Sequence, residues 1–322
     1  MTRRYVMEFE RPLIELQDKI AELRRLDLSE NIELSGEIEE LARQIETLHE
    51  HTYTHLSPWE KVQVSRHPDR PKTQDYLAAI FTGVIELHGD RTYGDDGAII
   101  AALATIEGHR VAVLGHRKGK DTRENIARNF GMVHPEGFRK AMRVMRLAER
   151  FGLPLVTFID TPGAYPGIEA EERGQAWAIA ESLALLSGLR VPVVAVGIGE
   201  GGSGGALAIG FGDRLIMLEN AYYSVISPEA CASILHKDAG KAAEVSGCLA
   251  MTSEDLVGLG IADEILPEPL GGAHHRPEEV FGAVRARVTT ALGELGALDP
   301  ALLEQRRYDR LRAIGVIDPG EG

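Results

Sequence analysis

The hydrophobic positions in the N-terminal part of the chain repeat with a helical period. Apolar side chains recur at spacings of three and four along residues 11–28 and again along residues 38–48, with charged residues between them. This spacing places the apolar side chains on one stripe of a helix. Because Ser35-Gly36 interrupts the pattern, residues 10–50 are predicted to form two helices of a hairpin. The hairpin cannot bury both stripes by itself, so we expect it to pack against the main body or a partner chain.

The pattern changes after the hairpin. Residues 57–94 look helical with breaks, whereas residues 98–106 and 110–114 are typical of a β-hairpin, and a helix is predicted at Glu136–Phe151. Short apolar runs then alternate with helical patterns. This alternation predicts an α/β architecture with mainly parallel strands and ligands at their carboxyl ends. We predict strands at 155–159, 192–198, 213–218, 221–226 and 261–266, helices at 169–188, 203–210 and 228–235, and a mostly helical remainder.

Composition and charge narrow the class of protein. The 322 residues are 44% hydrophobic and 26% charged, which is typical of a folded globular protein. The net charge of −14 argues against electrostatic binding of nucleic acid, which needs a basic face. No apolar run is long enough to span a membrane, and the start of the chain lacks the apolar segment of a signal peptide, so we expect a cytoplasmic protein. Cys231 and Cys248, without a CxxC motif, predict neither a disulfide framework nor a cysteine zinc site.

Two glycine-rich turns carry the candidate chemistry. Thr161–Gly167 and Gly199–Ala206 each follow an apolar run that ends like a buried strand, and each precedes a predicted helix. Backbone N–H groups at the N-terminus of a helix stabilise negative charge that develops on a ligand. The two turns therefore suggest chemistry done largely by the backbone, although other interpretations also apply.

One alternative is a dinucleotide site, because Gly197-x-Gly199-x-x-Gly202 follows a strand and has Glu219 about twenty residues on. That fingerprint belongs to the first βα turn of a domain, however, and several elements precede this one.

A second alternative is a serine hydrolase, since Ser203 is the centre of a G-x-S-x-G motif. A hydrolase has no need of a second glycine turn, and Ser203 is rather expected to cap a helix. The triad would be completed by Asp213 or Asp263 and by His236 or His274.

Tight turns and close packing are a purely structural explanation of the glycines. They account for one or two glycines well, but poorly for five between Gly199 and Gly205, because each glycine costs folding entropy. In the remaining interpretation, N–H groups around Gly163-Ala164 and Gly204-Gly205 point at an oxygen that gains negative charge. Enolate chemistry needs such an oxyanion site.

Long motifs in and around these turns resemble the carboxyltransferase alpha-subunit family of bacterial-type acetyl-CoA carboxylase. The resemblance covers essentially the whole chain, including the helical arm and Arg306-Arg307-Tyr308. Its motifs are Phe158–Gly167, Glu171–Gln175, Gly199–Gly210 and Tyr223–Glu229, with Arg128–Met132, Pro135–Gly137 and Pro267–His274 besides.

The resemblance implies an α/β fold of the ClpP/crotonase superfamily, a crotonase-like spiral of β-β-α units with an N-terminal helical hairpin. We expect a helical arm at residues 1–36, the crotonase-like carboxyltransferase domain at 37–295 and a helical tail at 296–322. The implied reaction passes a carboxyl group from carboxybiotin, presented by a separate carrier protein, to acetyl-CoA. The malonyl-CoA formed serves fatty acid synthesis.

The implied partners are a carboxyltransferase beta subunit in an α2β2 assembly, the biotin carboxyl carrier protein and biotin carboxylase. ATP is expected on another subunit, since the chain has no G-x-x-x-x-G-K-[ST] phosphate loop, and no Met-Lys-Met biotin attachment site occurs. We expect no metal in this chain, no nucleic-acid binding and no membrane insertion. Other acyl-CoA enzymes of the crotonase type stay open as an alternative, a hydratase or isomerase using Glu200 or Glu229, as does a non-catalytic scaffold.

The resemblance also assigns site residues. Gly204 and Gly205 form the hole for the ureido oxygen of biotin, and Gly205→Val is expected to abolish transfer while leaving the fold intact. Tyr165 either walls the biotin pocket or is a core aromatic. The substrate-binding residues of the same face are Gly163, Ala164, Tyr165, Gly201 and Gly202.

A run of basic residues lies before and within the predicted helix at 136–151. It could attract CoA phosphates or an acidic carrier domain, or it could be a solvated helix face. His88, His116, His134 and His274-His275 have no metal-binding spacing and are expected to be structural or surface residues. The basic run consists of Lys118, Lys120, Arg123, Arg128, Arg139 and Lys140.

Overall fold

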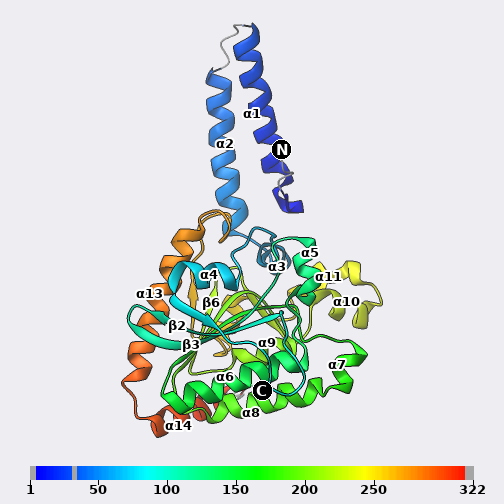
Figure 1. The fold of residues 1–322 in the computed structure, drawn as a ribbon. Helices are drawn as coiled ribbons and strands as arrows, with labels where there is room; N and C mark the ends of the chain where they lie inside the picture. The colour runs from blue at the N-terminus through cyan, green and yellow to red at the C-terminus, as the bar shows by residue number, and fades with distance from the viewer. Residues whose placement is uncertain (1–4, 31–34, 316–322) are drawn as a thin grey trace, which may run out of the picture.

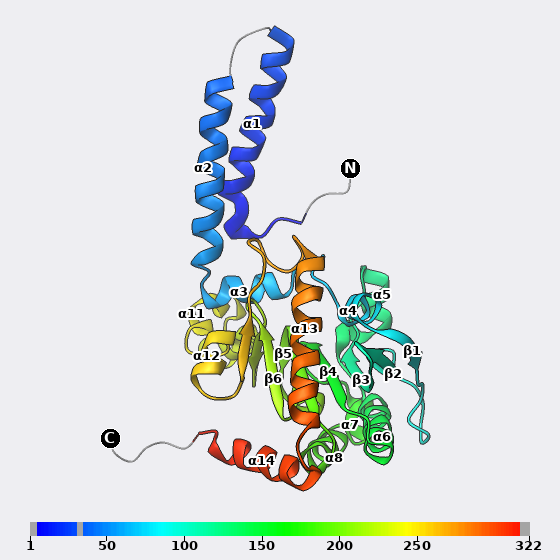
Figure 2. The same ribbon diagram turned by 90° about the vertical axis from the view of Figure 1, so that its left-hand side faces the viewer.

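A helical hairpin stands on an α/β body in the computed structural model, which describes residues 5–30 and 35–315 (Figure 1). The hairpin consists of α1 (Arg11–Glu30) and α2 (Ser35–Thr54), preceded by the short helix η1 (Glu8–Glu10). The two helices confirm the predicted hairpin. The break expected at Ser35-Gly36 is wrong, because both residues belong to the first turn of α2. Figures 1 and 2 both show the hairpin projecting away from the body, with only its base in contact.

The two hairpin stripes bury each other only in part. Leu13 and Ile20 of α1 and Leu41 of α2 are buried, whereas Ile45 and Leu48 are only partly buried. At the base, Tyr53 packs with Leu13 and with the fully buried Val64 of the body. The main body therefore covers the lower end of the hairpin, and the rest of both helices rises free of it.

The body is built on one eight-stranded sheet with the order β1-β2-β3-β4-β5-β6-β8, and β7 pairs with β5. The pairs β1–β2 and β2–β3 are antiparallel, and all the others are parallel. This confirms the predicted β-hairpin and the mainly parallel arrangement beyond it. The strands are β1 (Thr82–Glu86), β2 (Ile99–Ile106), β3 (His109–His116), β4 (Leu155–Thr161), β5 (Val193–Gly202), β6 (Arg214–Leu218), β7 (Tyr222–Ser224) and β8 (Glu264–Leu266).

Helices cover both faces of the sheet (Figures 1 and 2). Every residue of β4 and β5 is buried, as expected of parallel strands packed on two sides. Phe138 and Met142 of α6 pack on one face together with α8, while Tyr76 of α4 and Val284 of α13 pack on the other. The body helices are α3 (Pro58–Ser65), α4 (Thr73–Ile80), α5 (Thr122–Ala127), η2 (Asn129–Gly131), α6 (Pro135–Phe151), α7 (Ile168–Glu172), α8 (Gln175–Gly188), α9 (Ser203–Gly210), α10 (Pro228–His236), η3 (Ala239–Lys241), α11 (Ala242–Ser246), α12 (Ser253–Gly258), α13 (Pro277–Gly296) and α14 (Pro300–Ala313).

Three predicted elements differ from the structure. Residues 82–86 form β1 although their pattern looked helical, because the edge of β2 supplies backbone partners. The helix expected at 169–188 is broken into α7 and α8 at Gly174, whose φ of 81° is in the left-handed region. Gly199–Gly202 continue β5 instead of forming a turn, because Gly201 pairs with Thr161 on one side and Tyr223 on the other.

The C-terminal helix α14 is fastened by one buried arginine. The guanidinium of Arg307 donates to Asp213 Oδ1 at 2.9 Å and Oδ2 at 2.7 Å. It also donates to the carbonyl oxygens of Leu186, Leu189 and Val191.

Within the described residues, every helix is too short or too polar to cross a lipid bilayer.

Candidate active site

The two glycine segments meet at one edge of the sheet. β4 ends at Thr161 and its neighbour β5 ends at Gly202, and the two parallel strands pair through Thr161 and Gly201. The two chain segments that follow these strands therefore leave the sheet side by side. They are Gly163-Ala164 after β4 and the residues from Ser203 onward after β5. This confirms that the two segments share the carboxyl edge of the sheet.

Backbone contact between the segments requires glycine at two positions. A Cβ atom on Gly202 would lie within 3.0 Å of the carbonyl oxygen of Pro162, and one on Gly205 within 3.0 Å of the backbone of Gly163 and Ala164. The expectation that Gly205→Val leaves the fold intact is therefore wrong, because the added side chain would force the two segments apart. At Gly204 a Cβ atom would meet only the side chain of Ile179, at 3.4 and 3.5 Å, which is ordinary contact. Packing alone does not require glycine at Gly204.

The N-terminus of α9 faces this junction. The helix begins at Ser203, and its N-cap Gly202 offers no side-chain acceptor. Ser203 is thus the first residue of α9 and not its cap, so its prediction as a helix cap is wrong, and its φ of 48° lies in the left-handed region. The first N–H groups of a helix have no partner within it, so those of Gly204 and Gly205 are available to a ligand. On the other segment, the N–H of Gly163 donates to Thr161 Oγ1 at 3.1 Å, which leaves Ala164 as the better candidate donor.

His116, which is fully buried, connects the end of β4 with the start of α9. Nδ1 of His116 accepts the N–H of Asp160 at 3.3 Å, so Nε2 carries the proton and donates to the carbonyl oxygen of Gly205 at 3.1 Å. Burial lowers the pKa of His116 to about 4, which keeps the ring neutral at pH 7. The sequence indicated only a structural or surface histidine. Its position at the end of a buried strand was the one signal for a role at the carboxyl edge.

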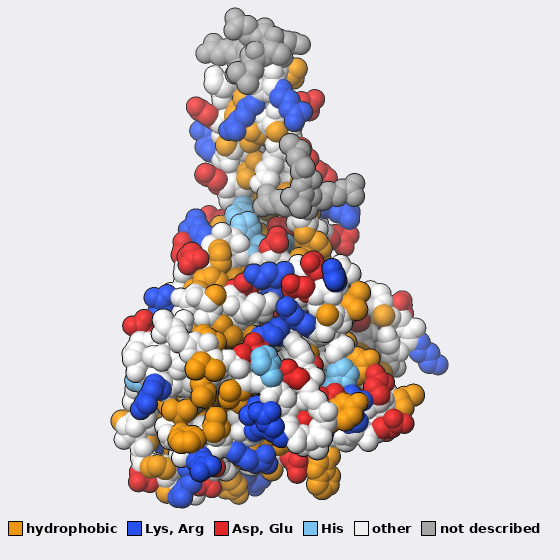
Figure 3. Space-filling view, in the orientation of Figure 1, with side chains coloured by type: hydrophobic (Ala, Val, Ile, Leu, Met, Phe, Trp, Pro, Cys, Tyr) orange, Lys and Arg blue, Asp and Glu red, His pale blue; other side chains and the backbone are white. Residues whose placement is uncertain are grey.

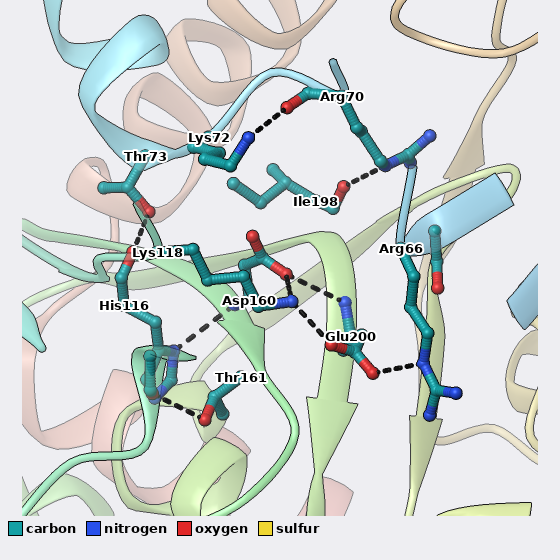
Figure 4. Close-up of polar contacts among 12 residues, drawn as sticks. Arg66, Arg70, Lys72, Thr73, His116, Lys118, Asp160, Thr161, Ile198 and Glu200 are labelled. Carbon is teal, nitrogen blue, oxygen red and sulfur yellow. Dashed lines mark hydrogen bonds and ion pairs between the residues drawn. The ribbon is translucent and has the colours of Figure 1, made fainter. Parts of the chain in front are cut away.

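Beside this junction lies a network of charged residues around two buried carboxylates, Asp160 and Glu200 (Figure 4). Nζ of Lys118 contacts Asp160 Oδ1 at 2.7 Å and Glu200 Oε2 at 2.6 Å, and so joins the ends of β4 and β5. Nε of Arg66 donates to Glu200 Oε1 at 2.6 Å, and its Nη1 pairs with Glu229. Burial opposes ionisation of Glu200, but Lys118 and Arg66 outweigh it and lower its pKa to about 2. Both carboxylates that a hydratase could use are thus held in ion pairs.

The basic run does not form one surface. Lys140 is buried and Lys118 is half-buried, and Nζ of Lys140 contacts Asp95 Oδ1 at 2.7 Å. Nε of Arg139 contacts Asp90 Oδ2 at 2.7 Å. Lys120 and Arg123 are exposed, so the interpretation as a solvated helix face is wrong for the run as a whole.

Tyr165 is half-buried and stacks on His134 with the ring centroids 4.1 Å apart, so it is not a core aromatic.

The geometry argues against both the hydrolase and the dinucleotide alternatives. Ser203 lines an apolar cavity of about 440 Å³ whose walls contain no histidine and no carboxylate, so His236 and His274 cannot complete a triad there. Gly197 and Gly199 lie inside β5 and not in a turn, so the dinucleotide fingerprint is not formed. The described residues include no group of three or more side chains placed to hold a metal ion.

Comparison with known proteins identifies the family. The family model described as acetyl co-enzyme A carboxylase carboxyltransferase-like matches residues 6–315. A relative from Thermus thermophilus, named acetyl-coenzyme A carboxylase carboxyl transferase subunit alpha, is 52% identical over 96% of this chain and 98% of its own length. The chain belongs to this family. A protein of the same name from Listeria welshimeri is 48% identical over 97% of the chain and 98% of its own length.

Solved structures with the same fold are more distant in sequence. The transcarboxylase 12S core superposes with a TM-score of 0.57 at 19% identity, covering 69% of this chain and 41% of that one. A chain of a Pseudomonas malonate decarboxylase hetero-tetramer, solved with coenzyme A, has a TM-score of 0.55 at 19% identity, covering 69% and 89%. These likenesses confirm the predicted crotonase-like α/β fold of carboxyltransferases.

Proposed function

We propose that this chain is the alpha subunit of the carboxyltransferase of acetyl-CoA carboxylase, and that it transfers a carboxyl group from carboxybiotin to acetyl-CoA. The observation that carries the proposal is the junction of the two glycine segments, found in a chain 52% identical to a named alpha subunit. The malonyl-CoA formed serves fatty acid synthesis. The hydratase, isomerase and scaffold alternatives are not favoured by the relatives.

The chain's part in the reaction is to stabilise charge with its backbone. Carboxybiotin, on a separate carrier protein, supplies the carboxyl group. We assign the N–H groups of Gly204 and Gly205 to its ureido oxygen, with Gly163, Ala164 and Tyr165 on the same face and Gly201 and Gly202 shaping the approach. The start of α9 fits this role for two reasons. Its first N–H groups lack partners within the helix, and the absence of a side chain at Gly204 leaves space for a ligand. Each such donor is worth about 3 kcal/mol of barrier.

We further propose that the chain works only with a carboxyltransferase beta subunit, in an α2β2 assembly served by biotin carboxyl carrier protein and biotin carboxylase. ATP is then used on another subunit. The cytoplasmic location stays a prediction. The division into an arm at 1–36, a carboxyltransferase domain at 37–295 and a tail at 296–322 is also kept as a proposal.

The test is the reverse reaction in the reconstituted complex. The purified chain is mixed with the candidate beta subunit, complex formation is verified by gel filtration, and malonyl-CoA-dependent carboxylation of free biotin is measured. Each chain alone is the control. Activity in the mixture alone supports the proposal, whereas a verified complex without activity contradicts it.

A further inference from the structure

Lys72 is a buried ammonium group without a carboxylate partner. The residue is only 9% exposed, and its Nζ donates to the carbonyl oxygens of Pro68 at 2.6 Å and Arg70 at 3.4 Å (Figure 4). Among the described residues, no Asp or Glu lies within ion-pair distance of it. A lysine has three N–H donors, so one remains for a ligand. Burying an unpaired charge is costly, which makes the missing partner informative.

The cavity around Lys72 is rich in positive charge. It has a volume of about 340 Å³, and its walls hold five Lys or Arg side chains against two carboxylates, those of Asp160 and Glu200. Both carboxylates are already held by Lys118, and Glu200 also by Arg66. Burial, reinforced by the nearby Lys118, lowers the pKa of Lys72 even though Asp160 opposes the shift. A bound anion would compensate this charge.

The other basic residues of the cavity have protein partners. Arg70 pairs with the buried Glu268 at 2.6 Å, and Lys120 pairs with Asp75 Oδ1 at 2.7 Å. Asp75 uses its second oxygen to accept the backbone N–H of Lys72 at 2.9 Å. Lys72 is therefore the wall residue whose charge the described protein leaves uncompensated.

The cavity also has a position that suits a substrate. One wall is Pro162, which directly precedes Gly163, so the cavity opens beside the glycine junction. A second hollow of about 570 Å³, between α4 and α13, shares Pro68, Arg70, Lys72 and Lys120 with the first. Lys72 thus lies where two hollows meet. Figure 3 shows Lys and Arg side chains gathered on the body below the arm.

We propose that Lys72 binds an oxyanion, a phosphate or a carboxylate, carried by a substrate that lies in this groove. The inference rests on the proposed carboxyltransferase function, which supplies two sources of such a group. One is the diphosphate of a coenzyme A thioester, and the other is the carboxyl group that is transferred. Lys118 and Lys120 flank the site and add to its positive potential.

Kinetics of the α–β complex test the site with Lys72→Met. Arg110→Met is the matched control, because Arg110 is an exposed residue at the amino end of β3, at the opposite edge of the sheet. Lys72→Arg retains the positive charge. The reverse reaction is measured with malonyl-CoA and with malonyl-pantetheine, which lacks the phosphates. We expect Lys72→Met to raise the KM of the affected substrate about tenfold or more, with kcat within about twofold of wild type.

The two thioesters distinguish the sources. A rise in KM for malonyl-CoA alone identifies a phosphate ligand, and an equal rise for both thioesters identifies the carboxylate. In either case Lys72→Arg should recover most of the loss and Arg110→Met should match wild type. Unchanged KM values for both thioesters, or a loss in kcat alone, would overturn the proposal.

A binding measurement separates this site from the proposed reaction. Inorganic pyrophosphate is titrated into the full-length wild-type and Lys72→Met chains by calorimetry, which requires no turnover. Weaker binding to Lys72→Met supports the site even if the wild-type complex has no transferase activity. Equal affinity of the two proteins, or no binding to either, contradicts it.

Discussion

His116 donates a hydrogen bond from Nε2 to the carbonyl oxygen of Gly205, at 3.1 Å, while its Nδ1 accepts the N–H of Asp160. One neutral ring therefore fixes the end of β4 against the start of α9. Because His116 is fully buried and contacts the backbone of the proposed ureido-oxygen site, it is a positioning residue. Its geometry fixes how the two glycine segments face each other.

His116→Ala should destabilise the protein by about 2–4 kcal/mol, because it leaves a cavity and two buried backbone groups without partners. His116→Gln, which retains one N–H donor, should lose less. Urea unfolding measures the stability. In the α–β complex we expect kcat to fall more than KM changes, and a variant with wild-type kcat would show that the ring does not position the site.

Stability should fall as the pH decreases from about 6.5 to 4. The folded protein holds His116 at a pKa of about 4 and, through burial and the neighbouring histidines, His274 at about 3, against an ordinary value of 6.5. Between these values the unfolded chain binds protons that the folded chain does not, so stability is complete above pH 6.5 and is lost as the pH falls. Urea unfolding at pH 7, 5.5 and 4.5 tests this. His116→Gln should show a shallower pH dependence, and an identical slope would contradict the assignment to His116.

Gly204 and Gly205 should respond differently to alanine. Gly205→Ala forces its Cβ against the backbone of Gly163 and Ala164, so thermal unfolding should occur at a clearly lower temperature. Gly204→Ala meets only ordinary contacts and gains helix propensity of up to about 1 kcal/mol, so its stability should match or exceed that of wild type.

If the proposed ureido-oxygen site is correct, Gly204→Ala should nevertheless lower transferase activity, because the methyl group occupies the approach to the N–H groups. The two variants are compared by calorimetry and by malonyl-CoA-dependent biotin carboxylation. Full activity of a stable Gly204→Ala complex would remove Gly204 from the site.

The network around Lys118 should be sensitive to loss of one partner. Lys118→Met leaves Asp160 and Glu200 without their shared cation, and breaking such a buried pair costs about 3–5 kcal/mol. Glu254→Gln is the contrasting change, because Glu254 is half exposed and its ion pair is with Lys61, so its cost should be about 0–1 kcal/mol. Denaturant titration of both variants measures the difference. Equal costs would show that the buried network contributes no more than a surface pair.

Arg307→Met should loosen α14 from the body. The substitution leaves Asp213 buried without its cation and removes the donors for three carbonyl oxygens in the last turn of α8 and in its connection to β5. We expect a loss of about 3–5 kcal/mol, together with faster proteolytic cleavage near residue 300. A variant with wild-type stability and cleavage rate would contradict this anchoring role.

The sequence predicted the helical hairpin, the β-hairpin and the alternating strands and helices, because each produces its own local period of apolar residues. It also placed the two glycine-rich segments that contain Gly163, Ala164, Gly204 and Gly205 after two predicted strands and before predicted helices. These predictions needed only short-range pattern and the rule that parallel strands present their carboxyl ends at one edge.

Only the tertiary structure decided that Gly199–Gly202 belong to a strand, since their backbone partners on β4 and β7 are distant in sequence. It also separated Gly205, where glycine is required by contact with Gly163, from Gly204, where it is not. The roles of His116, Lys118 and Lys72 depend in the same way on which groups the fold brings beside them. Local pattern determined the elements and their order, whereas close contacts between distant segments, which no local pattern encodes, decided how the site is built.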